Sequence, residues 1–293
     1  MKHFIDISDF NRKQLDAIIK KAKQLKKNPN KVSKKCHHKT LGMIFQKEST
    51  RTRVSFNVGF NKMGGNCIEL NANSIGFGKR ESHEDVLRTL SQYIDVLMIR
   101  NDDHNIIKNL STLKLIPIIN GLSDYSHPCQ ILSDLLTITE KLGDIKNQKI
   151  CWVGDYNNVL RSLIELQYIY NFKLSIVLPK EIIRKIKMKI IKNNNLSITS
   201  IIQDGVKSAH CVMTDAWISM GESSSKKRYF KNYQVNSDVM KNANRDAIFM
   251  HCLPAHRNEE VSSELLDSNH SVVWEQAQNR MFVQQAIILE LLS

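Results

Sequence analysis

The sequence predicts an α/β protein made of two doubly wound domains, each with a parallel sheet flanked by helices. Three observations support this fold class. Apolar runs typical of buried strands alternate with segments of helical periodicity along most of the chain. The length of 293 residues exceeds that of a typical single domain. A hydrophobic content of 42% is enough for two buried cores.

The first half begins with an amphipathic helix, which we expect Ser8 or Asp9 to cap and Asn28-Pro29 to end. Its apolar residues recur at helical spacing: Leu15, Ile18, Ile19, Ala22 and Leu25. Strands and helices then alternate. They are predicted at strand 41–45, a helix running from Ser49 to Gly64, strand 67–70, helix 84–93, strand 95–99, helix 105–113 and strand 116–119.

The second half repeats this alternation without repeating its residues. The expected elements are helix 131–142, strand 150–153, helix 159–170, strand 174–178, helix 181–192, strands 196–201, 211–214, 248–250 and 271–274, and helix 275–292. The segment 222–228 is too polar to pack, and we expect it to be mobile.

The strand-to-helix elbow at 45–56 concentrates groups that bind anions. Ser49 is a good N-cap, and the first amides of the following helix point out of its end at the positive pole of the helix dipole. Thr50 and Thr52 add hydroxyl donors, and a guanidinium can hold two phosphate oxygens at once. A basic, capped surface helix is the alternative to an anion site.

Arg51 and Arg53 cannot both serve one ligand, because residues two apart on a helix face nearly opposite ways. We assign Arg51 to the anion and Arg53 to a structural carboxylate. Two hydroxyl-arginine pairs in succession favour the anion site over a plain surface helix.

Further polar residues follow strands at the carboxyl edge, where ligands of such sheets bind. Arg100 ends one strand, and His127 and Gln130 lie three apart at the start of a helix, close enough to meet one small ligand. The alternatives are a surface arginine and a histidine that caps its own helix. The loop 71–82 is either a shared active-site segment or a simple connector.

Two motifs end strands of the second half: Asp215-Ala216-Trp217-Ile218-Ser219-Met220-Gly221 and His251-Cys252-Leu253-Pro254. Pro254 keeps Leu253 out of the helical region, which turns local carbonyls outward as acceptors. An inert buried thiol is the usual fate of a residue such as Cys252. The loop 154–158 lacks the GxGxxG fingerprint, so we predict no dinucleotide.

The composition limits the classes of partner and compartment. A net charge of +13 invites a nucleic-acid function, but the lysines are spread over helical faces, which favours solvated surfaces. Six cysteines without CxxC pairs favour a reducing compartment. Early acidic residues argue against a signal peptide, and no apolar run approaches membrane-spanning length. We therefore expect a cytoplasmic protein without nucleic-acid or membrane partners.

Four motifs, taken together, resemble the transcarbamylases, and within them the ornithine carbamoyltransferases. They are Ser49-Thr50-Arg51-Thr52-Arg53, His127-Pro128-Cys129-Gln130, and the two motifs that begin at Asp215 and His251. The resemblance covers nearly the whole chain in the right order. The first two motifs are typical of carbamoyl-phosphate enzymes in general, and the last two are specific for ornithine.

The resemblance implies transfer of the carbamoyl group of carbamoyl phosphate to the side-chain amine of L-ornithine. The products would be L-citrulline and phosphate, in arginine biosynthesis, with no metal or organic cofactor. The implied catalytic residues are Arg100, His127 and Cys252. The implied carbamoyl-phosphate-binding residues are Ser49, Thr50, Arg51, Thr52, Arg100, His127, Gln130, Cys252, Leu253 and Arg280. The implied ornithine-binding residues are Asn158, Asp215, Ser219 and Met220.

The resemblance also implies an organisation. Residues 1–130, completed by the C-terminal helix 275–293, would bind carbamoyl phosphate, and residues 131–274 would bind ornithine, with the active site in the cleft between the domains. Family members are homotrimers with shared active sites, in which the loop near 74–82 reaches a neighbouring subunit's site.

Four positions depart from the family pattern. Gln46 and Asn57 stand where an acidic residue is common, and Gln278 replaces an acid near Arg280. Gly76 occupies a place where many bacterial members carry a glutamine that touches carbamoyl phosphate.

The residues suit this chemistry independently of the resemblance. Attack by a neutral amine makes a tetrahedral oxyanion, which Arg100, Thr52 and His127 could stabilise. Asp215 offers the carboxylate that an α-ammonium group needs. The amine should have a free pKa of about 10.4, so the site must select its neutral form. Two rivals are a transcarbamylase for another amine such as putrescine, and a non-catalytic basic binding protein derived from the family.

Overall fold

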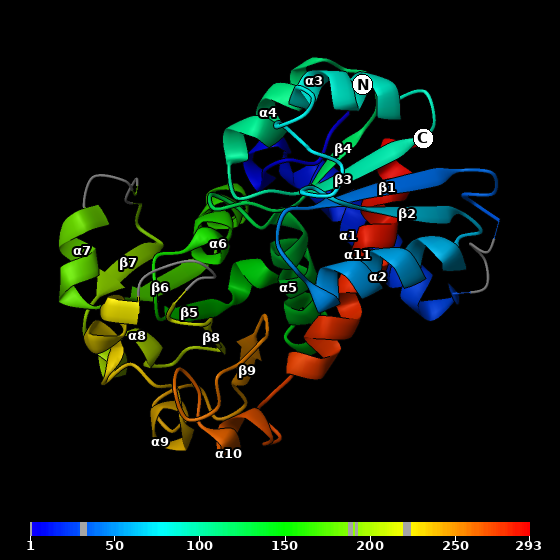
Figure 1. Ribbon diagram of the computed structural model, residues 1–293. Helices are drawn as coiled ribbons and strands as arrows, with labels where there is room; N and C mark the ends of the chain where they lie inside the picture. Colours follow the sequence, from blue (N-terminus) through cyan, green and yellow to red (C-terminus); the bar gives the residue numbers. More distant parts are fainter. Residues whose placement is uncertain (1, 30–33, 187–189, 191–192, 219–223) are drawn as a thin grey trace. The chain divides into compact units, whose positions relative to one another are not determined.

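The computed structural model describes residues 2–29, 34–186, 190, 193–218 and 224–293. The chain divides into two compact units, Met1–Leu136 with Gln278–Ser293, and Thr137–Ala277. Each unit contains one sheet whose strands are all parallel (Figure 1). The predicted fold class, two α/β domains with parallel sheets flanked by helices, is confirmed.

The sheet of the first unit places the carboxyl ends of its strands beside the elbow. Its strands are β1 (Thr40–Phe45), β2 (Asn66–Asn71), β3 (Val96–Arg100) and β4 (Ile118–Leu122), in the order β2-β1-β3-β4. The strand that follows β1 in the chain lies on one side of it, and the next lies on the other. The winding therefore reverses between β1 and β3, and such reversals form crevices beyond the carboxyl ends of the strands.

Helices cover both faces of this sheet. They are α1 (Arg12–Lys27), α2 (Thr50–Lys62), α3 (His83–Leu90), α4 (His104–Thr112) and α11 (Val273–Leu291). In Figure 1, α3 and α4 lie on one face, and α1, α2 and α11 lie on the other. Leu97 and Ile99 of β3 pack with α3 and α4. Because side chains alternate along a strand, Arg100 projects on the side of α2 and α11.

Most elements of the first unit lie within a few residues of their predicted positions, but the cap of α1 was predicted wrongly. Asn11 caps the helix and forms a capping box with Gln14. Ser8 and Asp9 belong to a preceding short 3₁₀ helix, Ile7–Asp9. The five apolar residues predicted for the inner face of α1 are all buried.

The second unit repeats the winding with five strands. They are β5 (Lys149–Val153), β6 (Lys173–Val177), β7 (Leu196–Thr199), β8 (Cys211–Thr214) and β9 (Ile248–His251), in the order β7-β6-β5-β8-β9. The winding reverses between β5 and β8. The crevice of this sheet therefore lies beside the loops that follow β5 and β8.

The helices of the second half are α5 (Pro128–Lys141), which begins in the first unit, α6 (Asn158–Tyr170), α7 (Lys180–Ile186), α8 (Ile202–Val206), α9 (Ser237–Met240) and α10 (Ser263–Leu266). Ile202 and Val206 of α8 share a buried core with Val177 and Phe249 of the sheet. The approach of α8 is close, because a Cβ added at Gly205 would lie 2.0 Å from Val177.

One prediction for the second half was wrong. Residues 271–274 do not form a strand: Ser271 makes only an isolated bridge to Phe249, and α11 begins at Val273. Val273 is buried in the core, so the apolar character of this run reflects burial of a helix start. The segment 222–228, which we expect to be too polar to pack, overlaps the 3₁₀ helix Ser224–Phe230. Phe230, two residues beyond the segment, stacks on Trp217. The predicted helix 181–192 runs partly outside the described residues.

Among the residues that the structure describes, no helix combines the length and the apolar character needed to cross a lipid bilayer.

Candidate active site

The elbow of the first unit presents an open helix end. Ser49 caps α2 and accepts a hydrogen bond from the Thr52 amide at 3.3 Å, as predicted. The amides of Thr50 and Arg51, the first two of the helix, have no hydrogen-bond partner among the described residues. Two donors at the positive end of a 13-residue helix are therefore available to an anion.

Arg53, one of the two arginines of the elbow, pairs with structural carboxylates as predicted. Its guanidinium pairs with Glu48 at 2.8 Å and Glu69 at 2.9 Å, and lies 5.4 Å from the centre of the Phe45 ring. Arg51, by contrast, has no side-chain hydrogen bond or ion pair with the described residues. Arg53 holds α2 against β2, which leaves Arg51 as the cation of the open helix end.

Arg100 brings a second guanidinium to this region. It lies opposite Phe45 in the register of β1 and β3, so the end of its strand is beside the start of the elbow. Its side chain is 8% exposed, and its Nε atom has no partner among the described residues. Burial, together with the charges of Arg280 and Arg51, lowers the pKa of Arg100 to about 10, against the opposing effect of Asp102. Arg100 therefore remains charged at neutral pH.

Arg280 of α11 ties three helices together. Its guanidinium donates to Thr52 Oγ1 of α2 at 2.9 Å and to Gln130 Oε1 of α5 at 2.7 Å. Gln130 in turn donates from Nε2 to the buried carboxylate of Asp134 at 2.8 Å. These contacts fix the orientation of the Gln130 amide. They leave its second N–H and a lone pair on Oε1 for a ligand.

His127 lies among these cations as a neutral imidazole. It is 4% exposed and directly precedes α5. Burial, followed by the charges of Arg280, Arg100 and Arg51, holds the pKa of His127 well below its usual range. The three guanidinium groups thus surround a side chain that cannot share their charge. Such a cluster is best complemented by a multiply charged anion such as phosphate.

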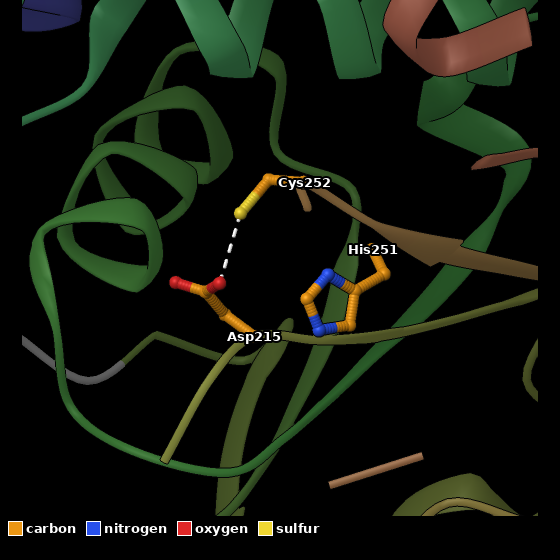
Figure 2. A group of neighbouring side chains, drawn as sticks. All are labelled: Asp215, His251 and Cys252. Atoms are coloured by element: carbon orange, nitrogen blue, oxygen red, sulfur yellow. Dashed lines mark hydrogen bonds between the residues drawn. The ribbon is translucent and has the colours of Figure 1, made fainter. Parts of the chain in front are cut away.

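The second unit gathers a different set of groups at its own crevice. In the parallel register of β8 and β9, Thr214 lies opposite His251, so Asp215 and Cys252 emerge side by side. The Cys252 thiol donates to Asp215 Oδ1 at 2.9 Å, and Figure 2 shows the two side chains pointing toward one another. Asn157 donates from Nδ2 to Asp215 Oδ2 at 2.7 Å. Each carboxylate oxygen keeps a lone pair for a further donor.

His251 supports the turn that presents Cys252. The Leu253 amide donates to His251 Nδ1 at 2.8 Å, so the ring proton lies on Nε2, which is 3.1 Å from Glu260 Oε1. Both side chains are fully buried. Burial raises the pKa of Glu260, but hydrogen bonds from His251 and the His256 amide prevail and keep it below its usual value. Leu253 itself has a φ of 58°, a rare conformation that these contacts hold in place.

Asp215, His251 and Cys252 lie close enough together to be considered as metal ligands. However, both ring nitrogens of His251 are already engaged by Leu253 and Glu260. The nearby group formed by His256, Glu259 and Glu260 shares that engaged Glu260 carboxylate. We therefore assign these side chains to hydrogen bonding.

The structure gathers most of the predicted site residues into two groups. The first unit holds Ser49, Thr50, Arg51, Thr52, Arg100, His127, Gln130 and Arg280. The second unit holds Asn158, Asp215, Cys252 and Leu253. Asn158 is the first residue of α6 and is partly buried. Ser219 and Met220 lie outside the described residues.

Sequence reasoning missed three residues that support these groups. Asn157 caps α6 while it binds Asp215, and its position before a predicted helix was the available signal. Asp134 lies four residues after Gln130, a spacing that places both on one face of a helix. Glu260, nine residues after His251, left no signal in the sequence.

One position noted for its departure from the family pattern has a structural role. The Gln46 side-chain oxygen accepts a hydrogen bond from the Asp102 backbone amide at 2.7 Å, and the Gln46 backbone amide donates to the Arg100 carbonyl at 3.0 Å. Gln46 thus joins the loop after β1 to the loop after β3, at the reversal of the sheet. An amide side chain can accept this bond as an acid would.

Fold and site together define a two-unit α/β protein with a centre of arginine side chains at one sheet and a carboxylate centre at the other. Profiles of both domains of one family match the sequence. The carbamoyl-P binding domain of aspartate/ornithine carbamoyltransferase matches residues 2–140, and the Asp/Orn binding domain matches residues 146–291. The chain belongs to the aspartate/ornithine carbamoyltransferase family.

Individual relatives agree with this assignment. An ornithine carbamoyltransferase from Ruthia magnifica subsp. Calyptogena magnifica is 41% identical, and the alignment covers 100% of each chain. The crystal structure of an ornithine carbamoyltransferase from Burkholderia thailandensis has a TM-score of 0.92 at 34% identity, covering 100% of this chain and 99% of that one. An anabolic ornithine carbamoyltransferase from Campylobacter jejuni subsp. jejuni has a TM-score of 0.90 at 33% identity, covering 99% of each chain.

The contrast between the two elbow arginines predicts opposite effects of the same substitution. Arg51→Ala should weaken binding of inorganic phosphate by about 10- to 100-fold, because a charge-assisted contact is lost, and should leave the free energy of unfolding nearly unchanged. Arg53→Ala should lower the free energy of unfolding by up to about 1 kcal/mol and leave phosphate affinity nearly unchanged. Calorimetric titration and urea unfolding of both variants measure these effects. Equal loss of phosphate affinity in both would contradict the division of roles.

The buried neutral His127 predicts a loss of stability in acid. The unfolded chain takes up a proton on this residue near pH 6.5, whereas the folded protein does not, so stability is retained above that pH and lost as the pH falls below it. The slope should reach about 1.4 kcal/mol per pH unit. Urea unfolding at pH 7 and 5.5 without phosphate should show a smaller acid loss for His127→Gln than for the wild type. Equal acid losses would show that His127 is not the group responsible.

Proposed function

We propose that the protein is an ornithine carbamoyltransferase, which transfers the carbamoyl group of carbamoyl phosphate to the side-chain amine of L-ornithine. The products are L-citrulline and phosphate. The observation that carries this proposal is the position of the buried, neutral His127 among Arg51, Arg100 and Arg280. The arginines supply a phosphate site, and the imidazole supplies an uncharged donor beside it. The ornithine carbamoyltransferases named above, which match along the whole chain, support it further.

The first unit binds carbamoyl phosphate. The open end of α2, with Ser49, Thr50, Arg51 and Thr52, holds the phosphate, which is the leaving group of the reaction. Arg100 bridges the phosphate and the carbonyl oxygen. Gln130 and His127 bind the carbamoyl group, and Arg280 holds Gln130 and Thr52 in position.

His127 and Arg100 stabilise the charge that develops during transfer. When the amine attacks, the carbonyl oxygen becomes an oxyanion, and donors already aimed at it lower the barrier. A neutral imidazole donates through one nitrogen only, so the tautomer with its proton toward the substrate is required. Arg100 keeps its proton at neutral pH and supplies the positive charge.

The second unit binds ornithine. The Asp215 carboxylate receives the α-ammonium group, and Asn157 and Cys252 hold it in position. Asn158, Ser219 and Met220 complete the amino-acid end of the site. Cys252 and Leu253 lie beside the reacting amine and also contact the carbamoyl group. A thiol that donates to Asp215 accepts no proton in that state, so Cys252 positions the amine unless it first passes its proton to the carboxylate.

These assignments give each unit a function. Residues 1–130 with the C-terminal helix 275–293 form the carbamoyl-phosphate-binding domain, and residues 131–274 form the ornithine-binding domain. The reaction needs neither metal nor organic cofactor, because arginines and helix amides already balance the charge of the phosphate. All six cysteines are free thiols, which supports a reducing cytoplasmic location. The anabolic relative supports a role in arginine biosynthesis.

The decisive experiment measures citrulline formation from carbamoyl phosphate, with ornithine, putrescine and aspartate offered in parallel. Ornithine should be the preferred acceptor, and its rate should rise from neutral to mildly alkaline pH, because the amine, with a pKa of about 10.4, must be neutral to attack. Asp215→Asn should lower kcat/KM for ornithine by at least about 10-fold, because a charged contact to the α-ammonium is lost. Preference for putrescine would reassign the substrate, and inactivity with every amine would favour a binding protein.

We further propose that three copies assemble into a homotrimer with shared active sites, in which the loop 74–82 of one copy reaches its neighbour. The support is an apolar patch on α2, formed by Val54 and Val58, which lie one helical turn apart and are 51% and 38% exposed. The edge strand β2 beside α2 adds Ile68, which is 47% exposed. Exposed apolar side chains and an open strand edge both favour contact with another chain.

Light scattering of the purified protein should give three times the mass of one chain. Val58→Asp should lower that mass, because a charge would be buried in the contact. Ile201→Asp, at an exposed apolar position of the second unit, is the matched control and should leave the mass unchanged. A wild-type mass of one chain, or equal dissociation of both variants, would refute the patch as the trimer contact.

A further inference from the structure

A buried polar cluster lies directly before His127 and has no part in the functions assigned above. It consists of Asp6, His104, Asn120, Ser123 and Ser126, which are all at most 7% exposed. Lys108 and Tyr125 lie at its solvent side, where the Lys108 ammonium is 5.8 Å from the centre of the Tyr125 ring. The cluster brings the N-terminal segment to the turn that carries His127.

Ser126, the residue before His127, is held at each of its polar groups. Its hydroxyl donates to Asp6 Oδ1 at 2.5 Å and accepts from Asn120 Nδ2 at 3.0 Å. Its amide donates to Ser123 Oγ at 3.1 Å, and its carbonyl accepts from the Ser123 amide at 2.9 Å. A hydroxyl-to-carboxylate bond of this length belongs to the strong, charge-assisted class.

Asp6 is held as a carboxylate by three donors. His104 Nε2 and Lys108 Nζ each lie 3.1 Å from Oδ2, and Ser126 binds the other oxygen. Burial raises the pKa of Asp6, but the hydrogen bonds from His104, Ser126 and Lys108 prevail and lower it. His104 is itself fixed through Nδ1, which lies 2.8 Å from Ser123 Oγ.

The backbone around Asp6 is anchored to the sheet. The Phe4 amide donates to the Ile118 carbonyl of β4 at 2.8 Å, and the Asn120 amide donates back to the Phe4 carbonyl at 2.8 Å. The Asn120 side chain also donates to the Ile5 carbonyl at 3.0 Å. Asp6 therefore has a fixed position relative to β4. Its hydrogen bond with Ser126 fixes the turn before His127 relative to the same strand.

We propose that Asp6 is a positioning residue for His127, acting through Ser126 to hold the imidazole where it meets the carbamoyl group. This inference rests on the proposed role of His127. The Asp6 carboxylate acts through the turn, because its Oδ1 accepts from the hydroxyl of Ser126, the residue directly before His127. A displacement of the imidazole by about 1 Å can cost about 100-fold in rate.

The test compares single and double variants in the citrulline assay with the full-length protein. Ser126→Ala removes one hydroxyl and should lower kcat by about 10- to 100-fold, with phosphate affinity and KM for ornithine within about two-fold of the wild type. Asp6→Asn, which keeps an oxygen acceptor, should lose less than Asp6→Ala. Ser175→Ala removes a buried hydroxyl from strand β6 of the second unit and should leave kcat unchanged.

A double-mutant cycle separates positioning from a merely structural effect. In a His127→Ala background, adding Ser126→Ala should change kcat by less than about two-fold, because the imidazole that it positions is gone. The same kcat loss in both backgrounds would overturn the proposal, as would a wild-type kcat in Ser126→Ala.

The outcomes also distinguish this inference from the proposed function. An inactive wild-type protein would overturn both. An active wild type that keeps its rate in His127→Ala would overturn the role of His127 and, with it, the positioning. An active wild type that depends on His127 but tolerates Ser126→Ala would overturn the positioning role alone. If Asp6→Ala does not fold, the Ser126 cycle still decides, because it deletes a single hydroxyl.

Discussion

The first unit depends on one guanidinium that arrives from the far end of the chain. Arg280 reaches Thr52 on α2 and Gln130 on α5, so the open start of α2 and the start of α5, which His127 directly precedes, are held by the same side chain. Burial, followed by the charges of Arg280, Arg100 and Arg51, lowers the pKa of the His127 imidazole. The guanidinium groups of three arginines thus lie around a neutral imidazole, and a bound anion would neutralise part of their positive charge.

In both units the polar cluster lies where the winding of the sheet reverses. In each sheet the winding reverses next to the first strand, and the loops on either side of that reversal carry the polar residues. In the first unit these loops are the elbow and the end of β3, which Gln46 joins. In the second unit they follow β5 and β8, and the bond from Asn157 to Asp215 joins them. One topology thus produces a cationic centre in one sheet and an anionic centre in the other.

The sequence predicted the fold class and the structural role of Arg53, because both follow from periodicity and spacing. Residues two apart on a helix face opposite ways, and Arg53 indeed pairs with Glu48 and Glu69. Contacts between distant segments could not be predicted in this way. Glu260 meets His251, and Asp6 meets Ser126, only after the sheets have formed. The apolar run at 271–274 wrongly predicts a strand, because an apolar run alone does not distinguish a strand from the buried start of a helix.

We propose that the open end of α2 and the arginines around His127 hold the phosphate of the substrate. The decisive measurement is a crystal structure with bound carbamoyl phosphate. We expect phosphate oxygens within hydrogen-bonding distance of the Thr50 and Arg51 amides and of the Arg51 and Arg100 guanidinium groups, with His127 donating to the carbonyl oxygen. A complex in which the phosphate lies elsewhere, or in which the protein's own side chains close the helix end, would contradict it.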